Sequence, residues 1–227
     1  QAVSRGLGDV YKRQLKDPQA IYERSFAIVR EQAVLDEVPD DLREVAVRVI
    51  HACGMPDIVD AIDASPDFAS GAIEALRNGA PVLCDCEMVA SGITRRFLDA
   101  GNEVIVTLND PEVPARAKAQ QTTRSAAAVD LWRPWIDGSV IVVGNAPTAL
   151  FRCLEIIGEE GARPAAIIGC PVGFVGAAES KAALATTKKV PFFAVHGTRG
   201  GSAMASAVVN ALALLGRGTD SCCLLYT

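Results

Sequence analysis

The sequence predicts an α/β protein with three layers and a doubly wound, mainly parallel sheet of five strands, preceded by extra N-terminal helices. The first reason is the run Ser-Val-Ile-Val-Val at 139–143, which is followed by a Gly-Asn turn and by a helical segment starting at Pro147. A strand that is apolar on both sides is typical of a parallel sheet covered by helices on both faces. The second reason is that four other short apolar runs alternate with helical segments, which predicts right-handed βαβ crossovers.

Three helices are expected before this alternation begins. The first spans about 17–35, the second begins at the Asp40-Asp41 pair and ends at Cys53, and the third runs from 65 to 79. Apolar residues recur at helical spacing in the second helix, and Gly54 suits the position directly after its end.

Five strands then alternate with five helices. The expected strands are 81–85, 104–108, 139–143, 165–169 and 191–195, and the expected helices are 87–98, 114–132, 147–157, 175–185 and 202–215. A flavodoxin-like strand order of 2-1-3-4-5 would place a site beyond the carboxyl ends of the strands, near strands one and three. At the helix that begins with Pro147, outward-pointing backbone N–H groups would favour an anion.

We expect a single domain over residues 15–217. Residues 1–14 are polar and aperiodic, and residues 218–227 form a short Cys/Leu tail. Both ends are therefore interpreted as foreign to the domain or disordered, and fold reasoning excludes them.

Composition narrows the classes of partner and compartment. The formal net charge of -5 gives no global basic field for nucleic acid, and the longest apolar runs are too short and too broken for a membrane span. The seven cysteines form no CxxC pair, and the first 14 residues contain no apolar signal segment. We therefore expect a cytoplasmic protein with reduced thiols.

The expected carboxyl ends of the strands are rich in Gly, Pro and small residues. Tight turns use such residues, but their number also suits close approach of the backbone to a large flat ligand. Neither GxxxxGK[ST] nor GxGxxG occurs at the first crossover, although a flavodoxin-like FMN binder would need neither motif. The run Asp85-Cys86-Glu87 lacks enough further ligands nearby, so no metal site is expected.

His51 lies near the end of the second expected helix, in the run Val-Ile-His-Ala-Cys-Gly. It could be a core histidine bonded to a backbone carbonyl, and its spacing slightly favours that reading. It could also be a general acid, because histidine exchanges a proton near neutral pH and a helix C-terminus favours its protonated form. The pattern alone leaves both readings open.

Seven motifs, in order along residues 16–215, resemble the precorrin-8X methylmutase family. They are AIYERSF at 20–26, VIHACG at 49–54, PVLCDCEMVASG at 81–92, TRSAA at 123–127, GNAPTAL at 144–150, PVGFVGAAESK at 171–181 and GGS at 200–202. The run at 171–181 is especially distinctive.

The resemblance implies an isomerase of cobalamin biosynthesis that moves a methyl group from C11 to C12 of precorrin-8X and yields hydrogenobyrinic acid. It implies no cofactor, no resident metal and no methyl donor, and a homodimer with its site near the interface. The family's catalytic histidine falls on His51. Its substrate-binding serine and arginine fall on Ser25 and Arg124.

The chemistry suits these residues. Protonating the macrocycle would make the migration terminus electron-poor, and one placed acid could do this. Arg124 and backbone N–H groups would receive substrate carboxylates. The expected substrate-binding set is completed by residues of the same motifs, namely Thr123, Asn145 and Gly173. Ser25 could equally be a helix serine bonded to its own backbone.

One loop departs from the family pattern. The sequence after the fifth strand is His196-Gly197-Thr198-Arg199, followed by Gly-Gly-Ser. Arg199 could reach the usual carboxylate from one position later, or that contact could be lost. We expect His196 to have no catalytic role, and Lys181 and Arg199 to lie outside the site. A cobalt-containing substrate and a tetrapyrrole carrier without turnover remain alternatives to the isomerase.

Overall fold

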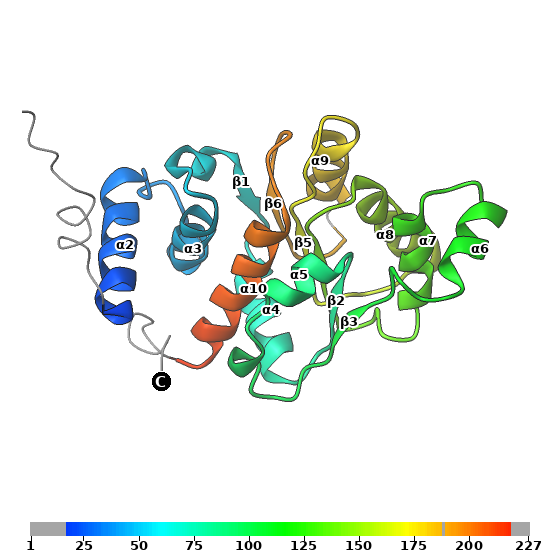
Figure 1. Cartoon of the computed structure of the whole chain (residues 1–227), viewed down its shortest axis with the longest axis horizontal. Coiled ribbons are helices and arrows are strands. Elements are labelled where there is room, and N and C mark those ends of the chain that lie inside the picture. The colour runs from blue at the N-terminus through cyan, green and yellow to red at the C-terminus, as the bar shows by residue number, and fades with distance from the viewer. Residues whose placement is uncertain (1–16, 188, 219–227) are drawn as a thin grey trace, which may run out of the picture.

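The computed structural model describes residues 17–187 and 189–218 (Figure 1). The expected tails, residues 1–14 and 218–227, lie outside this range except for Gly218. The chain forms a mixed α/β fold around a six-stranded sheet in the order β1-β6-β5-β4-β2-β3. Its strands are β1 (Ile62–Ala64), β2 (Val82–Cys84), β3 (Val104–Val106), β4 (Val140–Val143), β5 (Ala166–Gly169) and β6 (Phe192–Val195).

The prediction of a five-stranded sheet is wrong by one strand. The five expected strands are parallel neighbours and follow the expected order, but β1 pairs antiparallel with β6 and adds an edge. Its register sets Ile62 opposite Val195 and Ala64 opposite Phe193. This strand has three half-buried residues with Asp63 at its centre, so it carries no apolar run that could reveal it in the sequence.

Helices cover both faces of the sheet because its inner strands are apolar on both sides. In β4, Val140 and Val142 belong to one core, and Ile141 and Val143 belong to the other. The first core contains side chains of α2 (Pro18–Gln32), α3 (Arg43–Cys53), α4 (Phe68–Arg77), α5 (Glu87–Gly92) and α10 (Ser202–Gly216). The second contains side chains of α7 (Arg124–Val129), α8 (Pro147–Glu160) and α9 (Ala177–Thr187). In Figure 1, α10 crosses in front of the sheet, with α2 and α3 on one side of it.

Two expected helices are interrupted. The segment 114–132 is not one helix but α6 (Val113–Ala119), α7 and the short 3-10 helix η4 (Asp130–Trp132). The break lies at Gln121, whose φ is 52°, after which the Thr123 hydroxyl accepts the Ala126 N–H at 3.2 Å and begins α7. The left-handed residue Gln121 ends the first helical stretch and the N-cap Thr123 starts the second, which the alanine-rich composition of this segment hides.

The segment 87–98 is also divided, into α5 and the 3-10 helix η3 (Arg95–Phe97). Helix α5 ends where α10 comes very close: a Cβ on Gly92 would lie 2.3 Å from the Ser206 hydroxyl. Asn210 then accepts the Thr94 N–H at 2.8 Å and donates to the Gly92 carbonyl at 2.9 Å. These contacts with α10 replace the hydrogen bonds that would have continued the helix.

The remaining short elements are the 3-10 helices η1 (Asp40–Leu42) and η2 (Pro56–Ala61). Helix α3 follows η1 and ends as expected at Gly54, which has φ 68° and donates its N–H to the Ile50 carbonyl at 2.7 Å. This left-handed cap turns the chain away directly after His51. It therefore sets His51 in the last turn of the helix.

Candidate functional site

His51 is part of helix α3, and its side chain packs against helix α2. Its Nδ1 is 2.9 Å from the hydroxyl oxygen of Ser25, one of the residues expected at the site. The imidazole packs beside two aromatic rings of α2, with centroid distances of 5.4 Å to Tyr22 and 4.9 Å to Phe26. Ser25 is therefore a partner of the histidine in this structure. The alternative interpretation, a helix serine bonded to its own backbone, requires a bond from the Ser25 hydroxyl to a backbone group. No such bond occurs among the described residues.

The surroundings of the His51 ring in the protein favour a neutral imidazole. Burial lowers the pKa of His51 below its ordinary value, and the positive charge of Arg48 lowers it further. The expectation that the end of α3 would favour the protonated ring is therefore wrong, because desolvation and the nearby guanidinium outweigh the helix terminus. A neutral ring can accept a hydrogen bond from Ser25 or donate one to it.

His51 lines a cavity of about 490 Å³ between α2, α3, α5 and α10. The residues that shape its wall are Tyr22, Phe26, Arg48, His51, Met88 and Phe97, with Ser202, Ser206 and Asn210 from α10. No described residue bonds to Nε2 of His51, so this nitrogen is available to a molecule in the cavity. Of the site residues expected from the sequence, only His51 lines this cavity.

The sequence reasoning missed Arg48 and the α10 residues of this wall. Arg48 precedes His51 by one helical turn within an otherwise apolar run, which is an unusual place for an arginine. That signal could have identified it. The α10 residues carry no comparable signal, because serines and an asparagine in a small-residue helix are ordinary.

At the carboxyl edge of the sheet, the start of α8 already holds an anion from the chain itself. The buried carboxylate of Asp85, directly after β2, accepts the backbone N–H groups of Gly144, Asn145 and Ala146 at 3.0, 2.9 and 2.8 Å. Burial raises the pKa of this carboxyl, and the three N–H donors oppose the rise. The expectation that these N–H groups are free for a ligand is therefore wrong. Asp85 instead fixes the turn in which Asn145 lies.

Thr123 and Arg124 lie at the start of α7, on the same edge of the sheet. The Thr123 hydroxyl lies 2.8 Å from that of Thr148 on α8, so the two helix starts are joined. The exposed guanidinium of Arg124 donates to the Leu108 carbonyl at 3.2 Å and to the Asn109 side-chain oxygen at 3.4 Å. The structure thus links Thr123 to α8 and Arg124 to the loop after β3, and neither lines the cavity of His51.

Gly173 lies in the loop after β5, which is interlocked with the loop after β6. Its φ is 142°, and its N–H donates to the Thr198 carbonyl at 3.1 Å. The fully buried ammonium of Lys181 donates to the carbonyls of Pro171 at 3.0 Å and Arg199 at 2.7 Å. Lys181 therefore bridges the two loops, and burial lowers its pKa to about 8.

His196 and Arg199, in the loop after β6, also have partners in the protein. His196 Nε2 lies 2.9 Å from the carboxylate of Asp63 on β1, and the Arg199 guanidinium lies 2.6 Å from that of Asp57. Neither contributes to the wall of the His51 cavity. His196, Arg199 and Lys181 are thus bonded to other parts of the protein, and none of them lines the cavity of His51.

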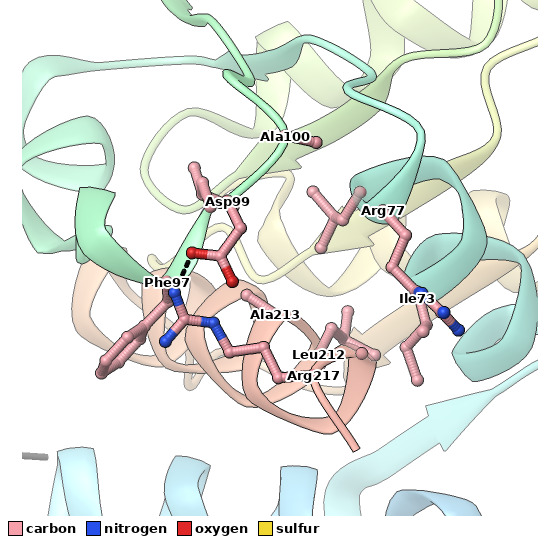
Figure 2. Close-up of a pocket in the computed structure, with 11 residues that line it drawn as sticks. Ile73, Arg77, Phe97, Asp99, Ala100, Leu212, Ala213 and Arg217 are labelled. Carbon is pink, nitrogen blue, oxygen red and sulfur yellow. Dashed lines mark hydrogen bonds and ion pairs between the residues drawn. The ribbon is translucent and has the colours of Figure 1, made fainter. Parts of the chain in front are cut away.

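A second cavity, of about 290 Å³, lies between α4, η3 and α10 (Figure 2). Arg217 and Asp99 form an ion pair at one side of it, and Leu212 and Ile73 line the other. Phe97 belongs to the walls of both cavities. None of the expected site residues lines the second one.

Three further findings concern the described part of the chain. It contains no cluster of three or more His, Cys, Asp or Glu side chains that could hold a metal ion. Its five cysteines are free thiols. None of its helices combines the length and the apolar character that crossing a bilayer requires.

Comparisons with known sequences agree on one family. A family model described as precorrin-8X methylmutase matches residues 20–215. Proteins named precorrin-8X methylmutase from Pseudomonas aeruginosa and Sinorhizobium sp. are each 54% identical over 200 residues, which cover 88% of this chain and 96% and 95% of theirs. A cobalt-precorrin-8 methylmutase from Salmonella typhimurium is 39% identical over 207 residues, covering 87% of this chain and 95% of that protein.

Solved structures give the same grouping. A crystal structure described as precorrin-8x methyl mutase from Thermus thermophilus matches with a TM-score of 0.82 and 38% identity, covering 89% of this chain and 100% of that one. A second, described as a precorrin-8X methylmutase related protein, matches with a TM-score of 0.77 and 33% identity, covering 86% and 100%.

Proposed function

The chain belongs to the precorrin-8X methylmutase family, and we propose that it moves the methyl group of precorrin-8X from C11 to C12 to give hydrogenobyrinic acid, with His51 as the general acid and base. The observation that carries this proposal is the 2.9 Å contact between the Ser25 hydroxyl and Nδ1 of His51, whose ring lines the 490 Å³ cavity. Holding the imidazole by one nitrogen leaves the other for the macrocycle.

Ser25 suits a histidine that must both give and recover a proton. A hydroxyl can donate to Nδ1 while Nε2 carries the proton, and it can accept from Nδ1 after Nε2 has lost it. A carboxylate in the same place would hold the ring as an ion pair and favour one tautomer. Ser25 therefore acts as a positioning residue for either state of His51.

The aromatic and apolar wall of the cavity excludes water from the reacting carbons. Tyr22, Phe26 and Phe97 offer ring surfaces to a flat conjugated ligand, and Met88 adds a flexible apolar side chain. Holding the macrocycle still and dry favours an intramolecular shift, because no second reactant has to be brought in. The protein's chemical contribution then reduces to one proton at the right position.

Carboxylates of the substrate would be received along the carboxyl edge of the flavodoxin-like, doubly wound sheet. Arg124 is exposed there, and its present bonds to Leu108 and Asn109 are long enough to be exchanged for a charged bidentate contact. Thr123, Asn145 and Gly173 supply hydroxyl, amide and backbone groups on the same edge. In this arrangement the substrate spans from Arg124 to His51.

We infer that two copies associate with the site near their interface. Phe174 and Val175, in the loop that Lys181 anchors, are 93% and 89% exposed. Adjacent large apolar side chains held out into solvent are typical of a surface that a partner covers. Light scattering of the purified protein, with Phe174→Asp compared with the natural chain, tests this association. We place the enzyme in the cytoplasm, where its free thiols would stay reduced.

The test of the function is incubation of the purified protein with precorrin-8X while the absorption of the corrin product is followed. Formation of the chromophore at catalytic protein concentration supports the isomerase. Binding without a change of chromophore would indicate a carrier instead.

A cobalt-containing substrate is the second candidate, because relatives named cobalt-precorrin-8 methylmutase share the family. The greater identity to relatives named precorrin-8X methylmutase supports the metal-free substrate. Parallel assays with metal-free and cobalt-loaded substrate separate the two, and faster turnover of the cobalt form would reverse the assignment.

A further inference from the structure

The second cavity (Figure 2) combines an apolar floor with a positively charged rim. Its buried apolar lining residues are Leu76, Phe97, Leu212 and Ala213. Its charged lining residues are Arg77, Arg217 and Asp99, so two arginines against one aspartate leave the rim positive. The whole chain has a formal net charge of -5, and this positive rim is therefore contrary to the general charge of the protein. An apolar hollow with a few charged groups suits a molecule that has an apolar body and an anionic end.

Arg77 is an exposed cation at the end of α4. No hydrogen bond or ion pair joins its side chain to another described residue. Its stem packs over the end of α10, since a Cβ on Gly216 would lie 3.3 Å from Cγ and 3.6 Å from Cδ of Arg77. Figure 2 shows this side chain beside Ile73, across the cavity from the ion pair of Arg217 and Asp99. The packed stem thus keeps the guanidinium at the rim, where its N–H donors are open to an anion.

Arg217 supplies a second guanidinium, and only one of its nitrogens is used. Its Nη2 donates to the Asp99 carboxylate and to the Arg96 carbonyl. The Asp99 side chain is 64% exposed, so water screens this ion pair and its contribution is small. The Nε of Arg217 is buried and has no hydrogen-bond partner among the described residues. A buried N–H without a partner is unfavourable, and an oxygen placed beside it would satisfy it.

We propose that this cavity binds a small carboxylate with an apolar stem, the stem lying against Leu212 and Ala213 and the carboxylate held by the arginines of the rim. The cavity of about 290 Å³ is at the lower end of the range of about 300–1,000 Å³ that is usual for ligand sites, so the ligand is a small acid. A neutral molecule of the same shape would gain the apolar contacts without the charged hydrogen bonds. Inorganic phosphate would gain the charge without the apolar contacts.

Two sources offer this chemistry. One is a free organic acid, which would bind whether or not the protein is a methylmutase. The other is a carboxylate side arm of the macrocycle, because Phe97 lines both this cavity and that of His51. The second source rests on the proposed function, whereas the site itself does not.

The first experiment titrates the purified protein with phenylacetate, with 2-phenylethanol as the neutral molecule of similar shape, and with inorganic phosphate. NMR signals of the backbone amides of α4 and α10 report the binding. We expect phenylacetate to bind about tenfold more tightly than either of the others, because it alone combines the stem with the charge. Equal affinities for phenylacetate and 2-phenylethanol would overturn the proposal. So would phenylacetate that leaves the signals of both helices unchanged.

The second experiment repeats the phenylacetate titration on three variants. Arg77→Met should lower the affinity about tenfold, the usual loss of a charged contact. Arg163→Met is the matched control and should bind like the natural protein, since Arg163 is also exposed but lies outside the cavity. Ala213→Leu should abolish binding by filling the floor, and thermal melting checks that this variant is folded. Equal affinities in Arg77→Met and Arg163→Met would overturn the proposal, whatever the stability of Ala213→Leu.

Hydrogenobyrinic acid distinguishes the two sources of the carboxylate. Displacement of bound phenylacetate by hydrogenobyrinic acid would support the site and identify a side arm of the macrocycle as its occupant. Binding of both molecules at once would support the site and identify a free acid. Failure of hydrogenobyrinic acid to bind the natural protein would count against the proposed function alone, because the phenylacetate titrations do not depend on it.

Discussion

The two histidines differ in the charge of the groups that surround them. His196 lies at the end of β6, where its Nε2 contacts the Asp63 carboxylate, and these side chains are 37% and 44% exposed. His51 lies against a cavity, with an uncharged partner in Ser25 and a cation nearby in Arg48. Water screens an ion pair that is exposed to solvent, so its contribution is small. An uncharged partner can bond to either state of the ring, which proton transfer requires.

The loops around His196 extend this contrast. Arg199 is paired with Asp57, and the Lys181 ammonium is occupied by two backbone carbonyls. Gly200 has to be glycine because a Cβ there would lie 2.4 Å from the Cys170 carbonyl oxygen. Charge in this region serves to hold two loops together. The comparison shows that the two histidines have different surroundings, and the role proposed for His51 rests on that difference.

The largest expected effect separates the two histidines. His51→Ala should fold and still bind the macrocycle, but it should convert it about 10²–10⁴-fold more slowly, the usual contribution of a general acid. His196→Ala is the matched control and should keep nearly natural turnover. Turnover and binding are to be measured on the same preparations. Near-normal turnover in a folded His51→Ala protein would refute the proposed mechanism.

Arg124 gives the next effect, on binding and not on the chemical step. Arg124→Ala should weaken binding of substrate and product by about 1.5–3 kcal/mol, roughly tenfold or more, if it receives a carboxylate. The fold should be intact, because among the described residues the hydrogen bonds of the exposed guanidinium go to the loop after β3. Arg163→Ala is the control, since this arginine is also exposed but precedes β5 at the opposite edge. Equal affinities in both variants would remove Arg124 from the site.

Lys181 tests the structural half of the comparison. Lys181→Met keeps a long apolar stem but leaves the carbonyls of Pro171 and Arg199 without their buried donor. The free energy of unfolding should therefore fall by about 1–3 kcal/mol. Chemical denaturation measures this, with Lys118→Met on the exposed face of α6 as a control that should change little. If the two variants are equally stable, Lys181 does not hold the loops.

The ion pair of His196 should contribute least to stability among these contacts. Removing one partner in Asp63→Asn should change the free energy of unfolding by about 0.2–1 kcal/mol, as expected for a solvent-exposed pair. The change should shrink further at high salt, because screening weakens exposed charges. A loss of several kcal/mol would mean that the edge strand β1 depends on this contact.

His51 should affect the pH dependence of stability in a defined direction. Because the folded-state pKa of His51 is lowered, the unfolded chain binds the proton at higher pH than the folded chain. The neutral ring therefore makes its full contribution to the free energy of unfolding at pH values above the pKa of the unfolded state. This contribution is lost as the pH falls from that pKa toward the lower pKa of the folded state. His51→Gln has no imidazole at this position, so the part of the stability loss at low pH that His51 causes should be absent. Unfolding measured from pH 8 to pH 5 in both proteins checks the direction.

Local patterns were sufficient for the helices that end in strong signals and for the inner strands. The apolar run of β4 predicts a buried strand because each of its residues must be covered from one side or the other. Gly54 predicts the end of α3, since few other residues adopt its left-handed conformation. The precorrin-8X methylmutase motifs led to the family and to His51, and the 2.9 Å contact with Ser25 joins two of the predicted residues.

Only the tertiary structure decided what each of these groups meets. Asp85 binds the turn at Gly144–Ala146, about 60 residues further along the chain, and so occupies N–H groups that the sequence left open to a ligand. Arg48 stands out within its apolar run, but only the packing of α2, α5 and α10 places it with His51 at the wall of one cavity. The segment of β1 becomes a strand because its backbone pairs with the edge of β6. Local sequence determines which backbone shape a segment prefers, whereas charge, burial and pKa depend on neighbours that folding brings from distant parts of the chain.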